Sequence, residues 1–289
     1  MDNTDGWSID AQLGFPPLEA MGWTIDAMPW RGDDVDWNRY DAVYIGTPWD
    51  YPDDPDRFMR VLGDVDRSAA ILVNDYALVS WAMPKTYLRD LERKGVEVVP
   101  GRWGERLDAG MIDDAFERFG TGQLIVKPVI STNAANTFLL PRDIPAQVEA
   151  QLRETFSDRA CVIQPFIENI RSDGEYSLFY FNRRFSHAIR KIPQRGDFRA
   201  QEERGAEIVA AKPETALRDA GARLLEMVEP MPVYARADFV RGADDRYLLM
   251  ELELVEPSMY LRMDKNAPRR FAEAFDDYVN EASANAREK

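Results

Sequence analysis

The sequence predicts an α/β protein that opens with a small doubly wound lobe and continues into lobes of mixed α+β type. Two observations support this fold class. Over roughly the first 80 residues, short apolar runs alternate with helical patterns, which is typical of a parallel sheet covered on both faces. From residue 175 onward, several strand-like runs follow one another with only short turns between them. At 289 residues the chain is long enough for two or three lobes with cores of their own.

The first part of the chain alternates between helix and strand signals. Asp54 or Asp56 is expected to cap a helix there, and Pro55 is tolerated in its first turn. No hydrophobic strand lies within Met1–Asp10, where such a lobe usually opens. Either a start upstream was missed or the first strand is absent, and we expect the former. The expected elements are a helix over 15–23, a strand over 24–30, a strand within 40–51, a helix over 54–65 and a strand over 69–75.

The rest of the chain supplies the α+β lobes. Gly95 is expected to end the first of its helices. Helices are expected over 84–95, 111–120, 145–156, 214–228 and 269–282. Strands are expected over 96–101, 123–131, 160–167, 175–182 and 184–192, and a β-hairpin over 234–240 and 247–255.

Composition excludes several classes of function. The net charge of −15 argues against a nucleic-acid partner, and no apolar run approaches the roughly 20 residues that cross a bilayer. One His and one Cys cannot assemble a Cys/His zinc site or a Cys–His nucleophilic pair. Neither a GxxxxGK[ST] loop nor a GxGxxG fingerprint is present. Cys161 lies in an apolar run, so a buried, reduced thiol and a cytoplasmic location are expected.

The hairpin over 234–255 carries charges that alternation places on one face. Arg236 and Asp238 are two residues apart, as are Glu251 and Glu253, while Leu248, Met250, Leu252 and Leu254 occupy the opposite face. If Asp238 faces Glu251 across the hairpin, Arg236 faces Glu253. Crowded carboxylates repel one another, and a magnesium ion held with substrate phosphates would remove that cost. The alternative is that these acids simply face water on a half-exposed sheet.

Two lysines are candidates for contacts with phosphate groups. Lys127 ends an apolar strand just before Pro128, so it is anchored on rigid backbone, and Lys85 opens the helix over 84–95. A basic stretch between Arg183 and Arg204 is a further candidate for binding a compact anion such as a triphosphate. Taken alone, Lys127 and Lys85 are better explained as solvated lysines, and the basic stretch can equally be a solvated loop. The order of the features along the chain is more informative than any one of them.

That order resembles the ATP-grasp superfamily of ligases. It resembles in particular the glutathione synthetase and D-alanine–D-alanine ligase group, and within it the cyclo-ligase of D-cycloserine biosynthesis and its relatives. The likeness runs from about Val35 to the last helix, and SHAIRK…GDFR and ELELVEP are its more specific strings. The shared strings are TPWDYPDDPDRF, LIVKPVIS, VIQPFI, GEYSLFYFN, SHAIRKIPQRGDFRAQ, YARADFV and ELELVEPSMYL.

The resemblance implies an ATP-grasp fold in three parts: a Rossmann-like domain over 1–80, a lid-bearing small lobe over 81–165 and a C-terminal lobe with the metal site over 166–289. The segment from Ser131 to Thr137 would be the loop that folds over the phosphates, although it lacks the glycines common there. Glu253 stands where related enzymes usually carry Asn. The nucleotide-binding residues it implies are Lys85, Lys127, Gln164, Pro165, Ile167, Glu175, Arg190 and Lys191.

The resemblance also implies a reaction. Asp238, Glu251 and Glu253 would bind two magnesium ions, and ATP would convert a substrate carboxylate into an acyl phosphate that an amine then attacks. Arg236 and Lys127 would be the catalytic residues, since positioning and electrostatics supply most of the acceleration. The substrates would be a small amino-acid-like carboxylate and a small-molecule amine, and a homodimer is suggested by analogy. Candidate substrate residues are Trp49, Asp50, Tyr51, Arg199 and Ser258, with Gln201 in the same loop as Arg199.

Three interpretations remain open at this point. A ligase that joins two molecules and a cyclo-ligase that closes a ring within one would use the same machinery. A non-catalytic nucleotide-binding or regulatory module would be expected to lose a magnesium ligand, yet all three carboxylates are present. A kinase that stops at the phosphorylated product would need no acceptor amine.

Overall fold

The N-terminal part of the chain is built around two parallel strands. The structure is a computed structural model that describes residues 7, 9–32 and 35–287. Asp54 begins the helix between the two strands, because its side chain accepts a hydrogen bond from Arg57 N at 3.0 Å. The elements of this part are α1 (Phe15–Ala20), β1 (Ala42–Tyr44), α2 (Pro55–Asp66), β2 (Ile71–Val73) and α3 (Tyr76–Ala82).

Most of the expected elements in this part are confirmed, but the strand over 24–30 is wrong. The segment is irregular and is held by its tryptophans instead. Trp23 donates to Asp276 at 2.9 Å and Trp30 donates to Asp50 at 2.7 Å. Of the apolar residues that suggested a strand, Ile25 and Trp30 pack against the rest of the protein, whereas Ala27 and Met28 are exposed. Before Ala42 the described residues contain no strand, and the expectation about Met1–Asp10 falls mostly outside the described residues.

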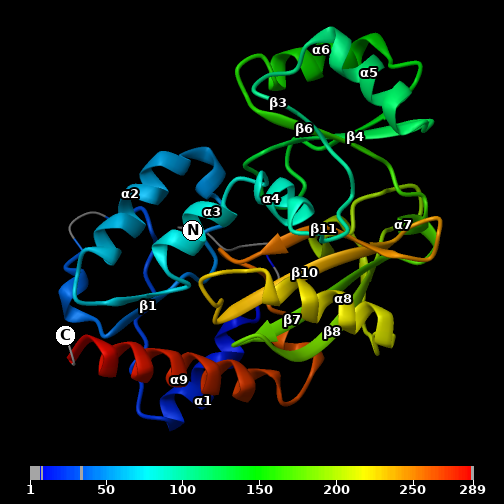
Figure 1. Cartoon of the computed structure of the whole chain (residues 1–289). Coiled ribbons are helices and arrows are strands. Elements are labelled where there is room, and N and C mark those ends of the chain that lie inside the picture. The colour runs from blue at the N-terminus through cyan, green and yellow to red at the C-terminus, as the bar shows by residue number, and fades with distance from the viewer. Residues whose placement is uncertain (1–6, 8, 33–34, 288–289) are drawn as a thin grey trace.

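The middle of the chain forms a small lobe with its own sheet, in the order β3-β6-β4-β5. Figure 1 shows α5 and α6 covering one face of this sheet, and their apolar side chains pack against Leu124, Val126 and Ile163. Cys161 is buried and free in this core, as expected. The elements are α4 (Tyr87–Arg93), β3 (Arg102–Gly104), α5 (Ala109–Phe119), β4 (Gln123–Pro128), β5 (Phe138–Pro141), α6 (Ala146–Thr155) and β6 (Cys161–Pro165).

The strand expected over 96–101 is reduced to one bridge. Val98 pairs with Leu249, and Val99 N donates to Leu249 O at 2.9 Å. Pro100 has no amide hydrogen and Gly101 follows it, so the pairing stops there. Three short strands, β3, β5 and β9, form where none was expected.

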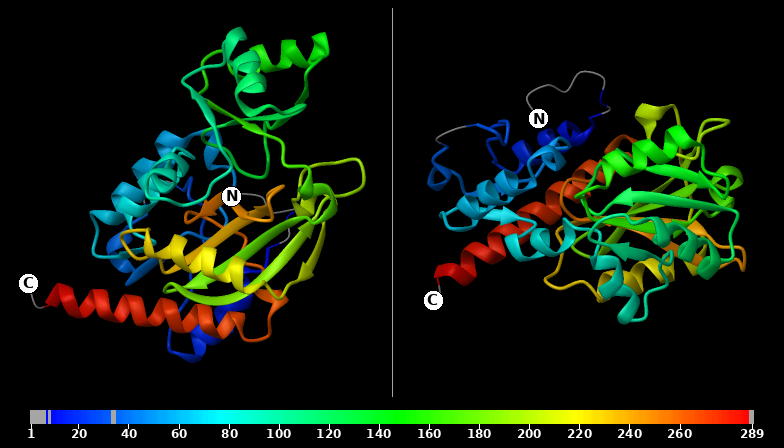
Figure 2. Two further views of the ribbon diagram at one scale, coloured as in Figure 1. Left: turned by 45° about the vertical axis from the view of Figure 1, so that its right-hand side comes forward. Right: turned by 90° about the horizontal axis from the view of Figure 1, so that it is seen from above.

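The C-terminal part contains the largest sheet, an antiparallel one in the order β11-β10-β7-β8-β9. Figure 2 (left) shows the small lobe at the end of the molecule opposite the long helix α9. The helices and strands predicted here are confirmed. The elements are α7 (Asn169–Ser172), β7 (Glu175–Phe181), β8 (Arg184–Ile192), β9 (Glu207–Ala210), α8 (Thr215–Glu226), β10 (Tyr234–Arg241), β11 (Tyr247–Glu253) and α9 (Ala267–Arg287).

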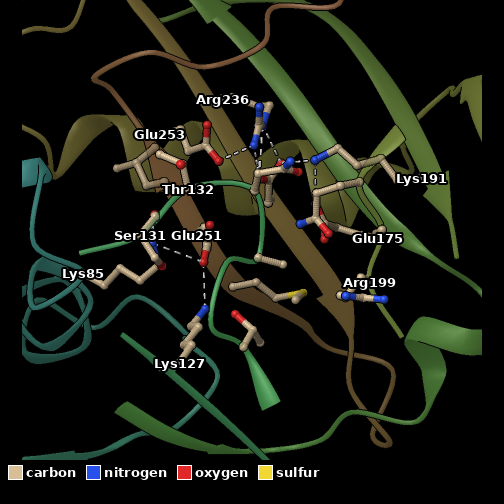
Figure 3. Close-up of a pocket in the computed structure, with 18 of the residues that line it drawn as sticks. Lys85, Lys127, Ser131, Thr132, Glu175, Lys191, Arg199, Arg236, Glu251 and Glu253 are labelled. Carbon is tan, nitrogen blue, oxygen red and sulfur yellow. Dashed lines mark hydrogen bonds and ion pairs between the residues drawn. The ribbon is translucent and has the colours of Figure 1, made fainter. Parts of the chain in front are cut away.

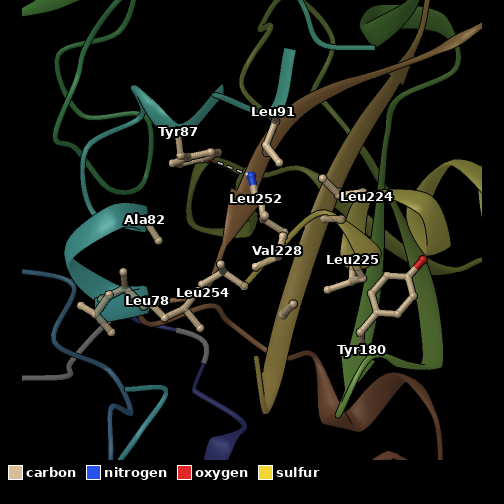
Figure 4. Packing of buried hydrophobic residues seen from close by; sticks show 14 of the residues in the cluster. Leu78, Ala82, Tyr87, Leu91, Tyr180, Leu224, Leu225, Val228, Leu252 and Leu254 are labelled. Atoms are coloured by element: carbon tan, nitrogen blue, oxygen red, sulfur yellow. Dashed lines mark hydrogen bonds between the residues drawn. The ribbon is translucent and has the colours of Figure 1, made fainter. Parts of the chain in front are cut away.

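One face of the large sheet is buried under α8, α3 and α4. In Figure 4, Leu252 and Leu254 lie between Leu224 of α8 and Leu78 of α3. Tyr87 of α4 adds a hydrogen bond between α4 and β11, because its hydroxyl accepts from Leu252 N at 2.8 Å. This apolar layer fixes β10 and β11 from behind and leaves their other face free to line a cleft.

A buried asparagine ties the N-terminal strands to the large sheet. Asn74 follows β2 and donates to Tyr234 O at 3.0 Å and to Leu254 O at 2.8 Å, while it accepts from Val233 N at 2.7 Å. These three bonds use most of the capacity of the side-chain amide. They hold the ends of β10 and β11 against the N-terminal part.

The hairpin alternation that we predicted is interrupted by a β-bulge. Asp238 pairs with Glu251, but Phe239 pairs with Leu249, so Met250 is the extra residue. Leu252 and Leu254 lie in the core as predicted, whereas Leu248 and Met250 do not share their face and belong to a separate apolar cluster.

The three sheets fall within the three ranges 1–80, 81–165 and 166–289. These exact domain boundaries remain a prediction. Among the described residues, no helix is long and apolar enough to cross a membrane.

Candidate active site

A deep cleft separates the underside of the small-lobe sheet from the open face of the large sheet. Ile125 and Lys127 point into it from β4, because the alternate residues Leu124 and Val126 face the helices of the small lobe. The N-terminal part closes one end of the cleft with Trp49 and Tyr51. The cleft therefore brings together side chains from all three parts of the chain.

The predicted acidic cluster forms on the floor of this cleft. Arg236 pairs with Glu253 and Asp238 with Glu251 in the register that we predicted. Carboxylate oxygens of Asp238, Glu251 and Glu253 all lie within 4.8 Å of one another. Asp238 is buried and the two glutamates are partly exposed to the cleft. Figure 3 shows Glu251 and Glu253 extending from the same strand into the cleft.

Two lysines approach Glu251 from the small-lobe side. Lys127 Nζ donates to Glu251 Oε1 at 2.8 Å, and Lys85 Nζ lies 3.7 Å from the same oxygen. Lys85 also donates to Ser131 O at 2.9 Å. Burial alone would raise the pKa of Glu251, but the charges of Lys127 and Lys85 outweigh burial and lower it to about 2. Glu251 is therefore an anion held between two ammonium groups.

Arg236 holds the other two carboxylates. Its guanidinium donates to both oxygens of Asp238, with Nη2 at 3.0 Å from Oδ2, and it also donates to Glu253. Burial tends to raise the pKa of Asp238, but Arg236 and Lys191 reverse that effect and lower it. Burial raises the pKa of Glu253 to about 7, since Arg236 offsets only part of the desolvation.

Lys191 completes the charged floor from β8. Its ammonium donates to Glu175 Oε1 at 2.7 Å and lies 3.5 Å from Asp238 Oδ1. Gly174, next to Glu175, has a φ of +81°, and a Cβ there would lie 2.6 Å from Lys191 O. Only glycine fits this approach, so Gly174 sets the distance between β7 and β8 at the Glu175–Lys191 pair.

Arg190, the neighbour of Lys191, does not reach the cleft. Successive residues of a strand point to opposite faces, so Lys191 lines the cleft and Arg190 lies 3.7 Å from Asp173 on the other side. Arg199 does line the cleft. It is held by Asp197, whose pKa falls to about 2 because Arg199 donates hydrogen bonds to it.

The far end of the cleft is apolar. The β-bulge turns Met250 into the cleft, opposite Ile125 of the small lobe. Gln164 also lines this end, and its side-chain amide donates to Val99 O at 2.9 Å. The cleft lining at this end comprises Val99, Ile125, Gln164, Pro165, Phe166, Ile167, Ile170, Phe198, Val240 and Met250.

The loop over Ser131–Thr137 lies beside the cleft and touches both neighbouring parts. Thr132 donates its hydroxyl hydrogen to Trp49 O at 2.8 Å, and Arg204 donates to Asn133 O at 3.2 Å. Asn133, Ala134 and Asn136 adopt positive φ angles, so this glycine-free loop turns through left-handed residues. The loop thus covers the cleft without glycines.

Among the predicted substrate residues, Trp49, Tyr51, Arg199 and Ser258 line the cleft. Asp50 does not. Its carboxylate accepts from Trp30 and lies 3.2 Å from Arg31, so it holds the N-terminal part together and borders a neighbouring cavity.

Sequence reasoning missed many of the residues that line the cleft, and Met250, Glu256 and Tyr260 are three examples. Met250 was placed on the face opposite Glu251 and Glu253, because nothing in the sequence marks the bulge. Glu256 and Tyr260 lie in the irregular segment after β11, where alternation gives no guide. Glu256 belongs to the string ELELVEP, and the repeated acidic residues of that string were the sequence signal that could have identified it as a cleft residue.

The donor set on the floor fits magnesium. Asp238, Glu251 and Glu253 supply only oxygen ligands, which a hard divalent cation prefers, and no His or Cys lines the cleft among the described residues.

The chain is also similar to known proteins in sequence. Residues 2–74 match a family described as the N-terminal domain of the D-cycloserine synthetase DcsG. The chain is 29% identical over 294 residues to the cycloserine biosynthesis protein DcsG of Streptomyces lavendulae, covering 94% of this chain and 95% of that protein.

Solved structures give the same result for the fold. The crystal structure of D-cycloserine synthetase DcsG matches with a TM-score of 0.81 and 25% identity, over 92% of this chain and 93% of that one. The ATP-grasp ligase PsnB, complexed with a phosphomimetic precursor variant, Mg and ADP, matches with a TM-score of 0.64, 18% identity and coverages of 93% and 94%. The D-alanine–D-alanine ligase from Coxiella burnetii matches with a TM-score of 0.62, 19% identity and coverages of 86% and 72%.

Proposed function

We propose that this chain, which resembles ATP-grasp ligases in sequence and fold, uses ATP and Mg²⁺ to join the carboxylate of a small amino-acid-like molecule to an amine through an acyl phosphate. One observation carries the proposal. The carboxylates of Asp238, Glu251 and Glu253 meet on one floor, and Lys127 faces them from the opposite lobe. This arrangement suits a nucleotide whose terminal phosphates lie between cations of the small lobe and metal ions on the hairpin.

The nucleotide has a place for each of its parts. The purine fits the apolar end of the cleft between Ile125 and Met250, next to the backbone of Pro165 and Ile167. Glu175 would accept hydrogen bonds from the ribose hydroxyls. Lys85, Lys127 and Lys191 would contact the phosphates, and Arg190 has no place in this proposal because it lies outside the cleft.

Asp238, Glu251 and Glu253 would hold the magnesium, and we expect two ions. Bound magnesium would neutralise the charge that develops on the phosphate oxygens. The residues themselves do the remaining work. Arg236 keeps Asp238 ionised and oriented, and Lys127 and Lys85 keep Glu251 ionised at neutral pH.

The proposed reaction has two steps. A carboxylate oxygen of the substrate attacks the γ-phosphorus, the bond to the β-phosphate oxygen breaks, and ADP leaves an acyl phosphate behind. The nitrogen of the amine then attacks the acyl carbon, the bond to phosphate breaks, and the amine loses a proton. Arg236 would stabilise the negative charge on the oxygen of the tetrahedral intermediate.

The acceptor amine can belong to a second molecule or to the same one. A cyclo-ligase reaction is favoured by the similarity to DcsG, whose name refers to cycloserine. A non-catalytic nucleotide-binding module remains the alternative. A cytoplasmic location and a homodimer stay predictions.

A substrate screen tests the proposal. Amino acids and small hydroxylamine or urea derivatives are supplied with ATP and Mg²⁺, and ADP release is measured together with the product mass. We expect substrate-stimulated ADP release and a product that has lost water relative to its precursors. ADP release that no compound stimulates would favour the non-catalytic alternative.

A further inference from the structure

Tyr260 is a buried phenol that lines the cleft while its hydroxyl makes no hydrogen bond. The residue is 4% exposed and lies in the irregular segment after β11. In the part of the chain that the structure describes, no group donates to this hydroxyl or accepts from it. A buried tyrosine hydroxyl usually finds a partner. The hydroxyl of Tyr260 is therefore a polar group of the cleft that the chain itself does not use.

The ring lies on the open face of the large sheet, beside two cations of the site. It packs against Phe179 of β7 and Ile189 of β8. Ile189 is two residues from Lys191 along the same strand, and Phe179 is paired with Arg236 of β10. Residues in either relationship share one face of a sheet. The ring of Tyr260 is therefore next to both cations on the floor of the cleft.

Contacts on several sides fix the ring in this place. Arg262 covers it, with Cζ 4.8 Å from the ring centroid, and Arg262 in turn donates to Glu202. The residue before the tyrosine is also held, because His187 Nε2 lies 3.1 Å from Met259 O. Tyr260 has a φ of +44°, which is uncommon for so large a side chain, and these contacts hold it there.

A phenol in these surroundings suits an anionic acceptor. Burial raises the pKa of the Tyr260 hydroxyl although the charges of Lys191 and Arg236 oppose that rise, so the hydroxyl keeps its proton at neutral pH. The neighbouring carboxylates of Glu175 and Asp238 accept from those two cations instead. The hydroxyl is thus a neutral donor beside two cations, and an anionic oxygen is the acceptor that forms the strongest hydrogen bond with it.

We propose that Tyr260 is a further catalytic residue, whose hydroxyl donates a hydrogen bond to an oxygen of the phosphoryl group that ATP transfers. This inference rests on the proposed function and adds a residue to its first step. The hydroxyl would keep its proton while the bond from the γ-phosphorus to the β-phosphate oxygen breaks and the bond to the carboxylate oxygen forms. Lys191 would bind the phosphates beside it, and the phenol would add a donor without adding charge.

Calorimetry with two nucleotides tests the proposal without a carboxylate substrate. The non-hydrolysable ATP analogue AMPPNP carries the γ-phosphoryl group, whereas ADP does not, and each is titrated into the intact chain with Mg²⁺. Tyr260→Phe keeps the ring and removes the hydroxyl. We expect its Kd for AMPPNP to rise at least about tenfold and its Kd for ADP to change less than about twofold.

Tyr180→Phe is the matched control. It removes another buried hydroxyl that has no partner, but this one lies in the core under α8 (Figure 4) and does not line the cleft. Both Kd values should stay within about twofold of the native values in this variant. An equal loss of AMPPNP binding in Tyr180→Phe would contradict the proposal.

Three further results would overturn it. An unchanged Kd for AMPPNP in Tyr260→Phe excludes the contact, and an equal loss of ADP and AMPPNP binding would indicate packing alone. Because the hydroxyl has no partner in the folded chain, the variant should keep its Tm, and a loss of folding would show a structural role instead. If the native chain binds neither nucleotide, the proposed function fails as well, whereas native binding of both with no change in Tyr260→Phe rejects this inference alone.

Discussion

Lys127 Nζ and Glu251 Oε1 lie 2.8 Å apart, although 124 residues separate them in the chain. The pair crosses the cleft from the small-lobe sheet to the metal hairpin. Both partners are mostly buried, with side-chain exposures of 9% and 26%. In the proposed function, phosphate oxygens would replace Glu251 as the partner of Lys127, and metal ions would replace Lys127 as the partner of Glu251. The ion pair joins the two sides of the cleft, and under the proposed function the same two residues would receive the nucleotide and its metal.

The two basic residues side by side on β8 should have different effects on nucleotide binding. Lys191→Gln removes the cation next to Glu175 and Asp238, and we expect it to weaken ADP–Mg²⁺ binding at least about tenfold. Arg190→Gln is the matched control, because its side chain lies outside the cleft, and it should change the Kd less than about threefold. Calorimetry measures both. A larger effect from Arg190→Gln would contradict the site.

Substitutions at the apolar end of the cleft should likewise distinguish a residue that lines the cleft from a neighbour that does not. Met250→Ala removes a side chain that lines the proposed purine site, and it should raise the KM for ATP about three- to tenfold with little change in kcat. Leu248→Ala is the control, since Leu248 belongs to the same apolar cluster but does not line the cleft. Steady-state kinetics, with the substrates other than ATP at saturating concentration, give the KM for ATP of both variants. Equal changes in KM would indicate a general loss of packing.

Arg236 should be irreplaceable even by lysine. Its guanidinium donates to both oxygens of Asp238 and to Glu253, and one ammonium cannot reproduce that geometry. Arg236→Lys should lower kcat at least about 100-fold, with a much smaller effect on the KM for ATP. Arg223→Lys, on the exposed side of α8, is the control and should retain full activity. Near-native kcat in Arg236→Lys would remove its catalytic role.

The single histidine should make the protein sensitive to acid. His187 is buried, stacks on Phe179 and has Nε2 3.1 Å from Met259 O. Burial, with a smaller contribution from Arg270, lowers the pKa of His187 to about 4, although Asp264 and the hydrogen bond to Met259 O oppose this. The folded state thus disfavours the protonated form. The resulting stability is fully present above pH 6.5 and is lost as the pH falls towards 4.

Between pH 7 and pH 5 this group alone should lower the free energy of unfolding by about 2 kcal/mol. His187→Gln should remove that part of the pH dependence, which denaturant titration at both pH values measures. The NMR signal of the His187 ring provides a direct check, because the chain has one histidine and its signal needs no assignment. A ring that titrates near pH 6.5 in the folded protein would refute the interpretation.

The site was predictable where regular alternation applies. The pairing of Arg236 with Glu253 and of Asp238 with Glu251 followed from a short turn and the two-residue period of a strand. The place of Lys127 at the end of an apolar strand allowed it to face either a cleft or solvent, and only the resemblance favoured the cleft. Alternation also shows that only one of Arg190 and Lys191 can face the cleft, but only the sheet order identifies which one.

The other features of the fold and the site could not be predicted, because they depend on contacts between segments that are distant in the sequence. The bulge that turns Met250 into the cleft arises from how β11 packs against the 97–99 segment and β10, which no local pattern reports. Glu256 lies in irregular backbone that Trp49 holds from the N-terminal part. The segment over 24–30 looked like a strand but is held by the side chains of Trp23 and Trp30.

Metal binding by the acidic cluster tests the central claim most directly. Glu251→Gln keeps the size of the side chain and one acceptor oxygen but removes the charge, whereas Glu226→Gln, on the exposed surface of α8, is the control. Mn²⁺, used as a paramagnetic substitute for Mg²⁺, is titrated in the presence of ADP and followed by electron paramagnetic resonance. We expect tight, ADP-dependent Mn²⁺ binding in the native chain and the control, and at least about tenfold weaker binding in Glu251→Gln. Native Mn²⁺ binding in Glu251→Gln, or the absence of ADP-dependent binding in the native chain, would contradict the account.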